Sequence, residues 1–251
     1  MRAQQIDRAL LLSSTGTGKS LASAFMLREM GTRRALFVVH REQIAKQTLK
    51  SYKRVFGSSR SYGLLSGNSR DFDAEFLFAT MQMISKEEIM SHYDPGDFDV
   101  IILDECHHAG AGSYQKIMRY FKPKFWLGMT ASPDTNQYDI YSIFDHHIAY
   151  EIRLQQALEE DLLCPFHYFG ITDLEIDGKV FDDNAGVKNF SNLISDARVD
   201  YVIDKANYYG FSGERVKGLI FCSRKDEAKE LSKKFNERGL RTEVLTGEDN
   251  Q

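Results

Sequence analysis

Runs of consecutive apolar residues recur along the first half of the chain, and stretches with apolar residues at helical spacing separate them. The runs interpreted as strands are residues 9–13, 35–39, 75–79, 99–104 and 124–128. Residues 21–30 predict a helix that stops at Gly31, and residues 41–56 predict an amphipathic helix that ends at Gly57. Because apolar strands alternate with helices, the pattern predicts an α/β fold with a mostly parallel sheet covered on both faces.

The pattern becomes less regular after about residue 152. The elements predicted there are a short helix at 154–160, a strand at 166–171, and an acidic loop or hairpin at 173–183. Ser195 is predicted to cap a helix at residues 196–209, which ends at Gly210.

A new strand–helix–strand pattern follows, with a helix at 225–238 between strands at 218–222 and 241–245. Two strands alone leave an open sheet edge, so we expect this segment to be only part of a larger domain. The predicted organisation is a first domain at residues 1–153, a connector at residues 154–215, and the truncated beginning of a second domain at residues 216–251.

Composition indicates an ordinary soluble globular protein, with 42% hydrophobic and 27% charged residues. Cys106, Cys164 and Cys222 lie far apart, which favours a reducing compartment and argues against a disulfide framework or a zinc knuckle. The apolar runs are too short to span a bilayer, and the first residues form no signal-peptide pattern. These features predict a cytoplasmic protein without membrane association.

The net charge of −4 gives no overall basic character, so nucleic-acid binding would need a local basic patch. One candidate is the stretch from residue 33 to residue 60, whose only acidic residue is Glu42. Its basic residues are Arg33, Arg34, Arg41, Lys46, Lys50, Lys53, Arg54 and Arg60. The alternative is a solvated helix face, because Lys46, Lys50 and Arg54 recur at helical spacing.

A glycine-rich segment between the first strand and the first helix has the character of a phosphate loop. Backbone N–H groups of such a loop can approach phosphate oxygens at the positive end of the following helix. Lys19 would then reach the β- and γ-phosphates of ATP, and the Ser20 hydroxyl would be a ligand of Mg²⁺. The predicted nucleotide-binding residues are Thr15, Gly16, Thr17, Gly18, Lys19 and Ser20.

This segment departs from the usual phosphate-loop pattern, because Ser13 occupies the position of the first glycine. A chance glycine-rich turn is the alternative interpretation. The flanking strand and helix favour the phosphate loop over that alternative.

Two carboxylates, Asp104 and Glu105, follow the apolar strand at 99–104. In a nucleotide-hydrolysing enzyme, Asp104 would bind Mg²⁺ mainly through its water shell, and Glu105 would orient or deprotonate the attacking water. The alternative is an ordinary acidic turn after a buried strand. The upstream phosphate loop favours the catalytic interpretation, in which Glu105 and Lys19 are the catalytic residues.

These segments resemble the conserved motifs of superfamily-two helicases of the DEAD/DEAH-box group, particularly those related to restriction-enzyme motor subunits. Residues 14–20 are similar to motif I, residues 104–107 (Asp-Glu-Cys-His) to motif II, and residues 130–132 (Thr-Ala-Ser) to motif III. The resemblance covers nearly the whole chain. It implies a three-layer P-loop sandwich like that of the RecA ATPase, followed by the start of a second such lobe.

The resemblance also implies roles for residues outside the phosphate loop. By similarity to the strand-contacting motifs, His40, Arg41, Gly67 and Thr80 would touch a nucleic-acid backbone, as a motor that moves along any sequence requires. For Gly67 and Thr80, plain turn and strand-end positions remain the alternative. The residues implied to couple hydrolysis to movement are His107, Thr130 and Ser132.

The histidines after the acidic pair could instead indicate a metal site with Cys106. Adjacent residues on one turn seldom converge on one ion, so we do not favour a metal site at Cys106, His107 and His108.

Two departures from the family pattern bear on activity. No upstream segment carries the glutamine with which such enzymes read adenine, and the sequence stops before the motifs of the second lobe that supply an arginine finger. That finger contributes roughly a thousandfold or more to hydrolysis in related phosphoryl-transfer systems. We therefore expect this chain to bind ATP and Mg²⁺ but to hydrolyse ATP slowly, since the remainder of the second lobe would be required.

The predicted function is ATP hydrolysis coupled to movement on nucleic acid, with DNA favoured over RNA by family analogy alone. Two other classes remain open: an ATP-switched nucleic-acid-binding module without productive turnover, and a P-loop phosphotransferase. Stimulation of hydrolysis by nucleic acid would separate the three.

Overall fold

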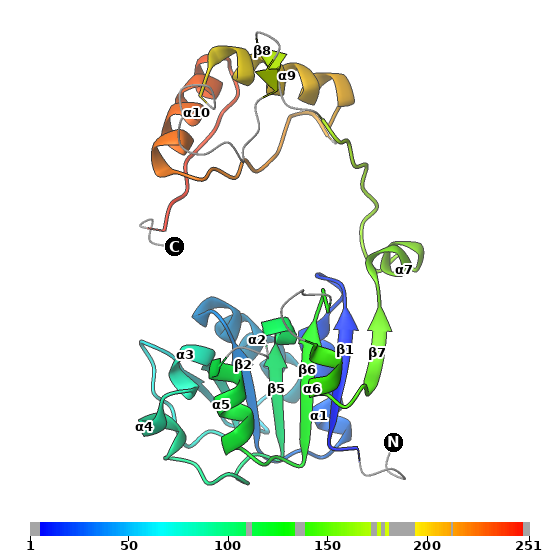
Figure 1. Cartoon of the computed structure of the whole chain (residues 1–251), viewed down its shortest axis with the longest axis vertical. Helices are drawn as coiled ribbons and strands as arrows, with labels where there is room; N and C mark the ends of the chain where they lie inside the picture. Colours follow the sequence, from blue (N-terminus) through cyan, green and yellow to red (C-terminus); the bar gives the residue numbers. More distant parts are fainter. Residues whose placement is uncertain are drawn as a thin grey trace. The chain divides into compact units, whose positions relative to one another are not determined.

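The chain packs into two units in the computed structural model, Met1–Pro165 (unit 1) and Phe166–Gln251 (unit 2) (Figure 1). The structure describes residues 6–108, 112–133, 139–171, 175–176, 179–180, 194–211 and 213–247. The boundaries predicted near residues 153 and 215 stay a prediction.

Unit 1 is built on a seven-stranded sheet in the order β3-β4-β2-β5-β6-β1-β7 (Figure 1). Every paired strand in this sheet is parallel to its neighbours. The strands are β1 (Arg8–Ser13), β2 (Ala35–Val39), β3 (Tyr62–Leu65), β4 (Phe76–Thr80), β5 (Val100–Asp104), β6 (Phe125–Thr130) and β7 (Ile148–Ile152).

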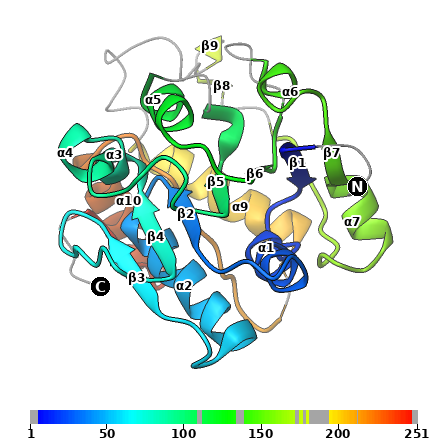
Figure 2. The same ribbon diagram turned by 90° about the horizontal axis from the view of Figure 1, so that it is seen from below.

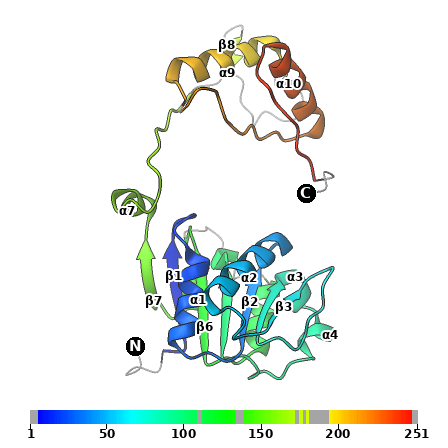
Figure 3. The same ribbon diagram turned by 180° about the vertical axis from the view of Figure 1, so that it is seen from behind.

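Helices cover both faces of the sheet, which confirms the predicted three-layer α/β fold (Figure 2). Two helices lie on one face, α1 (Lys19–Glu29) and α2 (Glu42–Phe56), as Figure 3 also shows. The opposite face carries α3 (Met81–Ile84), α4 (Glu87–Met90), α5 (Gly112–Tyr120) and α6 (Ile140–Ile143). A 3₁₀ turn, η1 (Cys106–His108), follows β5, and α7 (Leu154–Glu159) follows β7.

The two-sided burial explains why the central strands are continuous apolar runs. In β1, Leu10 and Leu12 pack into the core on the side of α3 to α6, whereas Leu11 packs into the core beneath α1 and α2. Successive side chains of a strand point to opposite faces, so both faces need apolar residues when both are covered. Sequence patterning identified these strands for this reason.

The two strands that the sequence did not predict, β3 and β7, are the two edges of the sheet. In β7 the first four residues are exposed, so the strand lacks a continuous buried run. An edge strand packs against fewer neighbours and can carry polar residues, which weakens its apolar signal. The short helices α3, α4 and α6, and the longer α5, were also not predicted.

Unit 2 contains the helices α9 (Asp196–Tyr209) and α10 (Lys225–Glu237) and a small hairpin. Ser195 caps α9 as predicted, since its side chain accepts a hydrogen bond from the Arg198 N–H at 3.3 Å. The guanidinium of Arg238 donates to the carboxylates of Asp196 and Asp200, which joins the end of α10 to the start of α9.

Three strands predicted for unit 2 are wrong, because the structure gives no strand at residues 166–171, 218–222 or 241–245. Their apolar composition favours strands, but a strand also needs a neighbouring strand to receive its backbone hydrogen bonds. Leu219 and Phe221 are instead exposed to 81% and 90%. The acidic loop or hairpin predicted at 173–183 contains an antiparallel hairpin of β8 (Glu175–Ile176) and β9 (Lys179–Val180); the rest of that prediction lies outside the described residues.

Within the described part of the chain, none of the helices has both the length and the apolar character that crossing a membrane requires.

Candidate functional site

The predicted functional residues of unit 1 follow the carboxyl ends of its strands. Lys19 comes after β1, Asp104 ends β5, and Thr130 ends β6. Because all the paired strands are parallel, these ends meet at one edge of the sheet, where ligands of open α/β sheets bind. In the order β5-β6-β1, β6 pairs with both β5 and β1, although β1 is far from the other two in sequence.

The phosphate loop is tightly folded on itself. Gly16 and Gly18 have positive φ angles of 89° and 90°, a conformation that favours glycine. The Thr17 hydroxyl donates to the Ser14 carbonyl at 2.7 Å and pairs with the hydroxyl of Ser13. Ser13, the departure from the usual glycine, therefore uses its side chain to close the loop.

Lys19 lies over the start of the same loop. Its ammonium donates to the carbonyl oxygens of Ser13 at 2.8 Å and Ser14 at 3.2 Å. Burial lowers the pKa of Lys19, and the negative charges of Glu105 and Asp104 oppose that shift. The lysine that follows β1 and the carboxylates that follow β5 therefore interact in the folded chain.

The surroundings of Asp104, the first residue of the acidic pair, disfavour its ionised form. Burial raises the pKa of Asp104 to about 6, and the charge of Glu105 adds to the shift, while the Glu105 N–H and Lys19 oppose it. Glu105 itself has a positive φ of 49°, which is uncommon for a residue other than glycine. Strained backbone of this kind gathers at functional sites, because the surrounding packing can hold it there.

A short polar chain joins motif II to motif III. Nδ1 of His107 lies 3.2 Å from Oε2 of Glu105 and 3.0 Å from Oγ1 of Thr130. The Thr130 hydroxyl donates to the Ser132 carbonyl at 3.3 Å, and the Ser132 N–H donates back to it at 3.2 Å. The structure thus brings together Glu105 and the three residues that the resemblance implied for coupling.

The donor set at this edge fits a nucleotide-bound Mg²⁺. Carboxylate and hydroxyl oxygens are the ligands that Mg²⁺ prefers, and Mg²⁺ in such sites takes further ligands from water and substrate phosphates. Asp104 and Ser20 offer such oxygens beside the N-terminus of α1, and no described side chain caps that helix. Over the described residues, no group of three or more His, Cys, Asp or Glu side chains is placed to hold a metal by itself.

The residues predicted to touch nucleic acid follow the neighbouring strands at the same edge. His40 and Arg41 come directly after β2, Thr80 ends β4, and Gly67 comes shortly after β3. The order β3-β4-β2-β5 places them on the side of β5 away from β6 and β1. Arg41 and Gly67 are exposed, whereas Thr80 is buried and His40 packs its ring edge-to-face on Tyr114.

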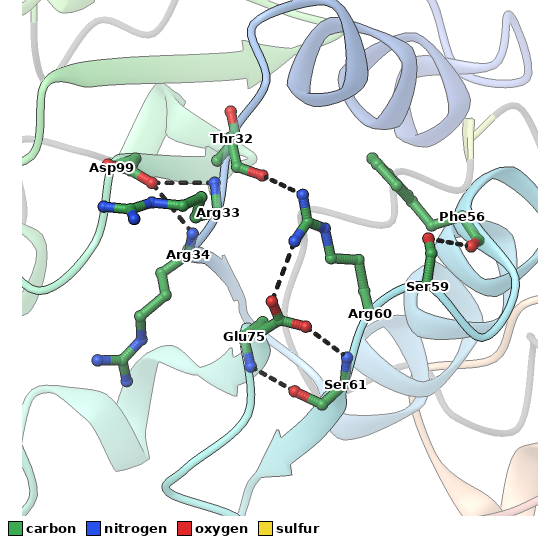
Figure 4. A network of polar contacts seen from close by, with 9 residues as sticks. All are labelled: Thr32, Arg33, Arg34, Phe56, Ser59, Arg60, Ser61, Glu75 and Asp99. Atoms are coloured by element: carbon green, nitrogen blue, oxygen red, sulfur yellow. Dashed lines mark hydrogen bonds and ion pairs between the residues drawn. The ribbon is translucent and has the colours of Figure 1, made fainter.

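The basic stretch from residue 33 to residue 60 does not form one patch. At the amino ends of the strands, the Arg33 and Arg34 N–H groups donate to Asp99, and the Arg60 guanidinium donates to Glu75 at 3.0 Å (Figure 4). Arg60 also donates to the carbonyl of Thr32 at 3.2 Å. Arg33, Arg34 and Arg60 fasten the edge opposite the phosphate loop, whereas Arg41 follows the carboxyl end of β2 at the candidate functional edge.

Two residues near the site were missed by sequence reasoning. The Tyr114 hydroxyl donates to the Asp104 carbonyl at 3.1 Å, which fixes the end of β5 from α5. Leu163, beyond α7, lies against Gly16 of the phosphate loop. Tyr114 could have been found only by predicting α5, and Leu163 has no local sequence signal.

Comparisons with known proteins agree with this geometry. The chain is 26% identical over 255 residues to the type I restriction enzyme EcoAI endonuclease subunit of Escherichia coli, covering 90% of this chain and 31% of that protein. It is 22% identical over 260 residues to the putative ATP-dependent helicase IRC3 of Saccharomyces cerevisiae, covering 95% and 37%. The chain therefore spans about a third of the length of these relatives.

Among solved structures, the Hef helicase domain of Pyrococcus furiosus has the same fold, with a TM-score of 0.52 and 19% identity over 94% of this chain and 53% of that one. The family model described as "Type III restriction enzyme, res subunit" matches residues 1–135, which is 135 of the 251 residues. These residues include the phosphate loop, the acidic pair and the Thr-Ala-Ser motif. The chain belongs to this family of restriction-enzyme res subunits, within the superfamily-two helicases.

Proposed function

We propose that this chain is the ATP-binding part of a DNA translocase, in which ATP hydrolysis drives movement along the DNA backbone. The observation that carries the proposal is that Lys19 and Glu105 lie at the same edge of the sheet, where His107 contacts both Glu105 and Thr130. The candidate backbone contacts His40, Arg41, Gly67 and Thr80 follow the next strands along that edge. The restriction-enzyme family and the ATP-dependent helicase relative support this assignment.

In the proposed reaction, the ammonium of Lys19 binds the β- and γ-phosphates of ATP, aided by the loop N–H groups and the N-terminus of α1. The nucleotide-binding residues would be Thr15, Gly16, Thr17, Gly18, Lys19 and Ser20. The Glu105 carboxylate orients the attacking water and accepts its proton. The charge of Lys19 also offsets part of the repulsion between Asp104 and Glu105.

Ser20 and Asp104 would hold Mg²⁺ with the nucleotide. When bound, Mg²⁺ neutralises the charge that develops on the phosphate oxygens. Asp104 is suited to this role because it is a partly buried carboxylate beside a second carboxylate, and the cation would relieve their repulsion.

The contact from Glu105 through His107 to Thr130 and Ser132 would couple chemistry to movement. A change in the charge at Glu105 would alter its contact with Nδ1 of His107, and the same Nδ1 is hydrogen-bonded to the Thr130 hydroxyl. The carboxyl end of β6 would therefore respond to events at the carboxyl end of β5.

DNA is proposed over RNA because the family and the EcoAI relative are restriction enzymes by description. Contact would be made mainly to phosphates, since a motor must tolerate every base sequence.

Single-turnover ATP hydrolysis with the chain in excess tests the proposal, with single-stranded DNA, double-stranded DNA or RNA added. We expect DNA to accelerate hydrolysis, and Glu105→Gln to slow it by about a hundredfold or more, the usual contribution of a positioned general base. Nucleotide binding by Glu105→Gln should persist. If ATP binds and no polymer changes its hydrolysis, the translocase assignment is wrong, and a switch or a transferase should replace it.

The nucleic-acid contacts have a matched pair of variants. Arg41→Ala should weaken DNA binding and reduce its salt dependence, because each phosphate contact adds about one unit to the salt slope. Arg33→Ala removes the same charge at the opposite edge and should leave both quantities unchanged. Equal effects of the two variants in fluorescence anisotropy would refute the proposed DNA-binding edge.

A further inference from the structure

A residue near the end of unit 1, Leu163, lies beside the phosphate loop. A Cβ atom placed on Gly16 would lie 3.1 Å from Cδ2 of Leu163, so the leucine side chain lies beside this glycine, which itself is exposed. Gly16 lies in the middle of the loop and has a φ of 89°. The apolar tip of Leu163 is therefore next to the middle of the proposed phosphate loop.

The backbone around α7 fixes Leu163 in this place. The N–H groups of Leu162 and Leu163 both donate to the Ala157 carbonyl, at 2.9 and 3.1 Å. Ala157 is fully buried, and Asp161 makes the turn with a φ of 55°. Leu163 is half-buried, whereas its neighbour Leu162 is 50% exposed. The turn therefore directs one of two adjacent leucines toward the loop.

The other end of the same segment is also joined to the loop. The Ser14 N–H donates to the Ile152 carbonyl at 3.2 Å, and Ser13 pairs with Ile152 in the parallel register of β1 and β7. The segment that begins at Ile152 and includes α7 thus contacts the phosphate loop at its start and again at Leu163. Movement of the loop cannot leave this segment unaffected, because packed contacts transmit displacement.

A bound phosphate would compete with bonds that the loop now makes to itself. The Lys19 ammonium donates to the carbonyls of Ser13 and Ser14, and the Thr17 hydroxyl also donates to Ser14. Phosphate oxygens are stronger partners for an ammonium than carbonyls are, since both partners are then charged. Transfer of Lys19 to a phosphate would break its bonds to the Ser13 and Ser14 carbonyls, which close the loop across Gly16, and would shift the loop next to Leu163.

We propose that Leu163 is a positioning residue through which the phosphates of a bound nucleoside triphosphate displace the chain that leads into unit 2. This inference rests on the proposed binding of a nucleotide at the loop. Leu163 stands two residues before Pro165, the last residue of unit 1, so no further element separates it from unit 2 in sequence. Because coupling between two equilibria is reciprocal, Leu163 also affects nucleotide affinity. The contact of Leu163 with the loop favours the state in which Lys19 binds the loop carbonyls over the state in which Lys19 binds a phosphate.

Cys164 supplies a reporter beside Leu163, because this thiol is exposed while that of Cys106 is buried. A Cys222→Ser background would leave Cys164 as the accessible site for an environment-sensitive thiol dye. The experiment titrates a non-hydrolysable ATP analogue with Mg²⁺ into this labelled chain and follows the dye, while calorimetry measures nucleotide binding by the same protein. The variants compared are Leu163→Ala, Leu163→Met and the matched control Leu162→Ala, each checked for unchanged thermal unfolding.

We expect the dye signal to change with the nucleotide concentration that saturates the calorimetric binding. Leu163→Ala should abolish the signal and tighten nucleotide binding by about fivefold, the lower end for coupled sites. Leu162→Ala should leave both quantities unchanged, and Leu163→Met should restore the signal. A leucine that served only to stabilise the fold would change thermal unfolding without removing the dye response.

Nucleotide binding without a dye response, or a full response in Leu163→Ala, would overturn the role of Leu163 and leave the proposed function standing. Absence of calorimetric nucleotide binding in every variant would instead refute the proposed function and the coupling that rests on it.

Discussion

Unit 1 and unit 2 both contain short apolar segments of the kind that form strands, and the two units use them differently. In unit 1, β5 (Val100–Asp104) has a strand on each side, and its first four residues are buried. In unit 2, the segment at 218–222 forms no strand, and Phe221 is 90% exposed. The side chains are similar, so the difference comes from the neighbours that receive backbone hydrogen bonds.

This difference between the units explains why the candidate catalytic residues lie in unit 1. Asp104 and Thr130 end strands that have neighbours on both sides, and Lys19 follows a third such strand, so the sheet supports the positions of all three. Catalytic groups need such rigid support, because small errors in position cost reaction rate. In the described part of unit 2, ion pairs of Lys234 and Arg238 with the exposed carboxylates of Asp196 and Asp200 join α10 to α9, and such pairs hold positions less firmly than a sheet does.

The largest expected difference between the units is in the effect of replacing one phenylalanine of each by alanine. Phe37 lies in β2, is 2% exposed and packs against the rings of Tyr52 and Phe78. Phe37→Ala should lower the free energy of unfolding by about 3–5 kcal/mol, because it leaves a cavity in a packed core. Phe221→Ala should change it by less than about 0.5 kcal/mol, as surface substitutions do.

Denaturant unfolding followed by fluorescence and far-UV circular dichroism measures both effects. Trp126 is the single tryptophan, is buried in β6 and so reports on unit 1, while circular dichroism reports on both units. A loss in Phe221→Ala as large as that in Phe37→Ala would mean that the segment at 218–222 is packed in solution.

Two glycines provide a second test, with a smaller expected effect. A Cβ on Gly128 in β6 would lie 2.5 Å from the ring of Phe144, whereas a Cβ on Gly218 would meet nothing within 4 Å. Gly128→Ala should therefore destabilise unit 1 by about 1–3 kcal/mol through overpacking. Gly218→Ala should leave the Trp126 transition unchanged, and unchanged unfolding in both variants would show that β6 and α6 are not closely packed.

The network at the amino ends of the strands gives a pH-dependent test. Although burial favours the neutral form of Asp99, hydrogen bonds from Lys124 and from the backbone of Arg34 and Arg33 hold the pKa of its carboxyl below the usual value. A depressed pKa stabilises the fold above the unfolded value of about 3.9 and loses that contribution as the pH falls through the folded value. Asp99→Asn should cost about 1–3 kcal/mol at neutral pH, because the N–H groups of Arg33 and Arg34 and the ammonium of Lys124 lose a charged acceptor.

The cost of Asp99→Asn should begin to shrink below about pH 4, where the unfolded carboxyl becomes protonated, and should disappear as the pH falls through the lower pKa of the folded carboxyl. A cost that stays constant as the pH is lowered well below about 4 would show that the charge of Asp99 does not stabilise unit 1.

The smallest effect is expected from the exposed network of unit 2. Hydrogen bonding to Arg238 holds the pKa of the Asp200 carboxyl below its usual value, but this side chain is 59% exposed. Asp200→Asn should therefore destabilise the protein less than Asp99→Asn, and high salt should remove the difference from wild type because ions screen surface charges. Thermal unfolding followed by circular dichroism at low and high salt checks this, and a larger, salt-independent loss would contradict it.

The difference between strands with neighbours on both sides and segments without them also determined which elements could be predicted from the sequence. The five central strands could be predicted because burial on both faces demands continuous apolar runs, and the phosphate loop and acidic pair lie in continuous local segments. The edge strands β3 and β7 could not, because an edge strand such as β7 tolerates exposed and polar residues. The strands predicted in unit 2 failed because residue patterns do not report the presence of a neighbouring strand.

Contacts across the sheet were the least accessible to sequence reasoning. The link between His107 and Thr130 depends on β5 and β6 being adjacent, which the order of the strands determines. The contact between Leu163 and Gly16 depends in addition on the turn after α7. Both join residues that lie far apart in the chain.

Calorimetric titration of the chain with ADP and Mg²⁺, repeated with Lys19→Ala and with the exposed-lysine control Lys50→Ala, tests the central claim most directly. A nucleotide site in unit 1 requires one ADP to bind per chain. Lys19→Ala should weaken that binding by about tenfold or more, since a hydrogen bond to a charged group contributes about 1.5–3 kcal/mol. Lys50→Ala should bind as the wild type does. Absence of binding, or equal affinity in wild type and Lys19→Ala, would contradict the assignment of the phosphate loop and with it the function proposed for the chain.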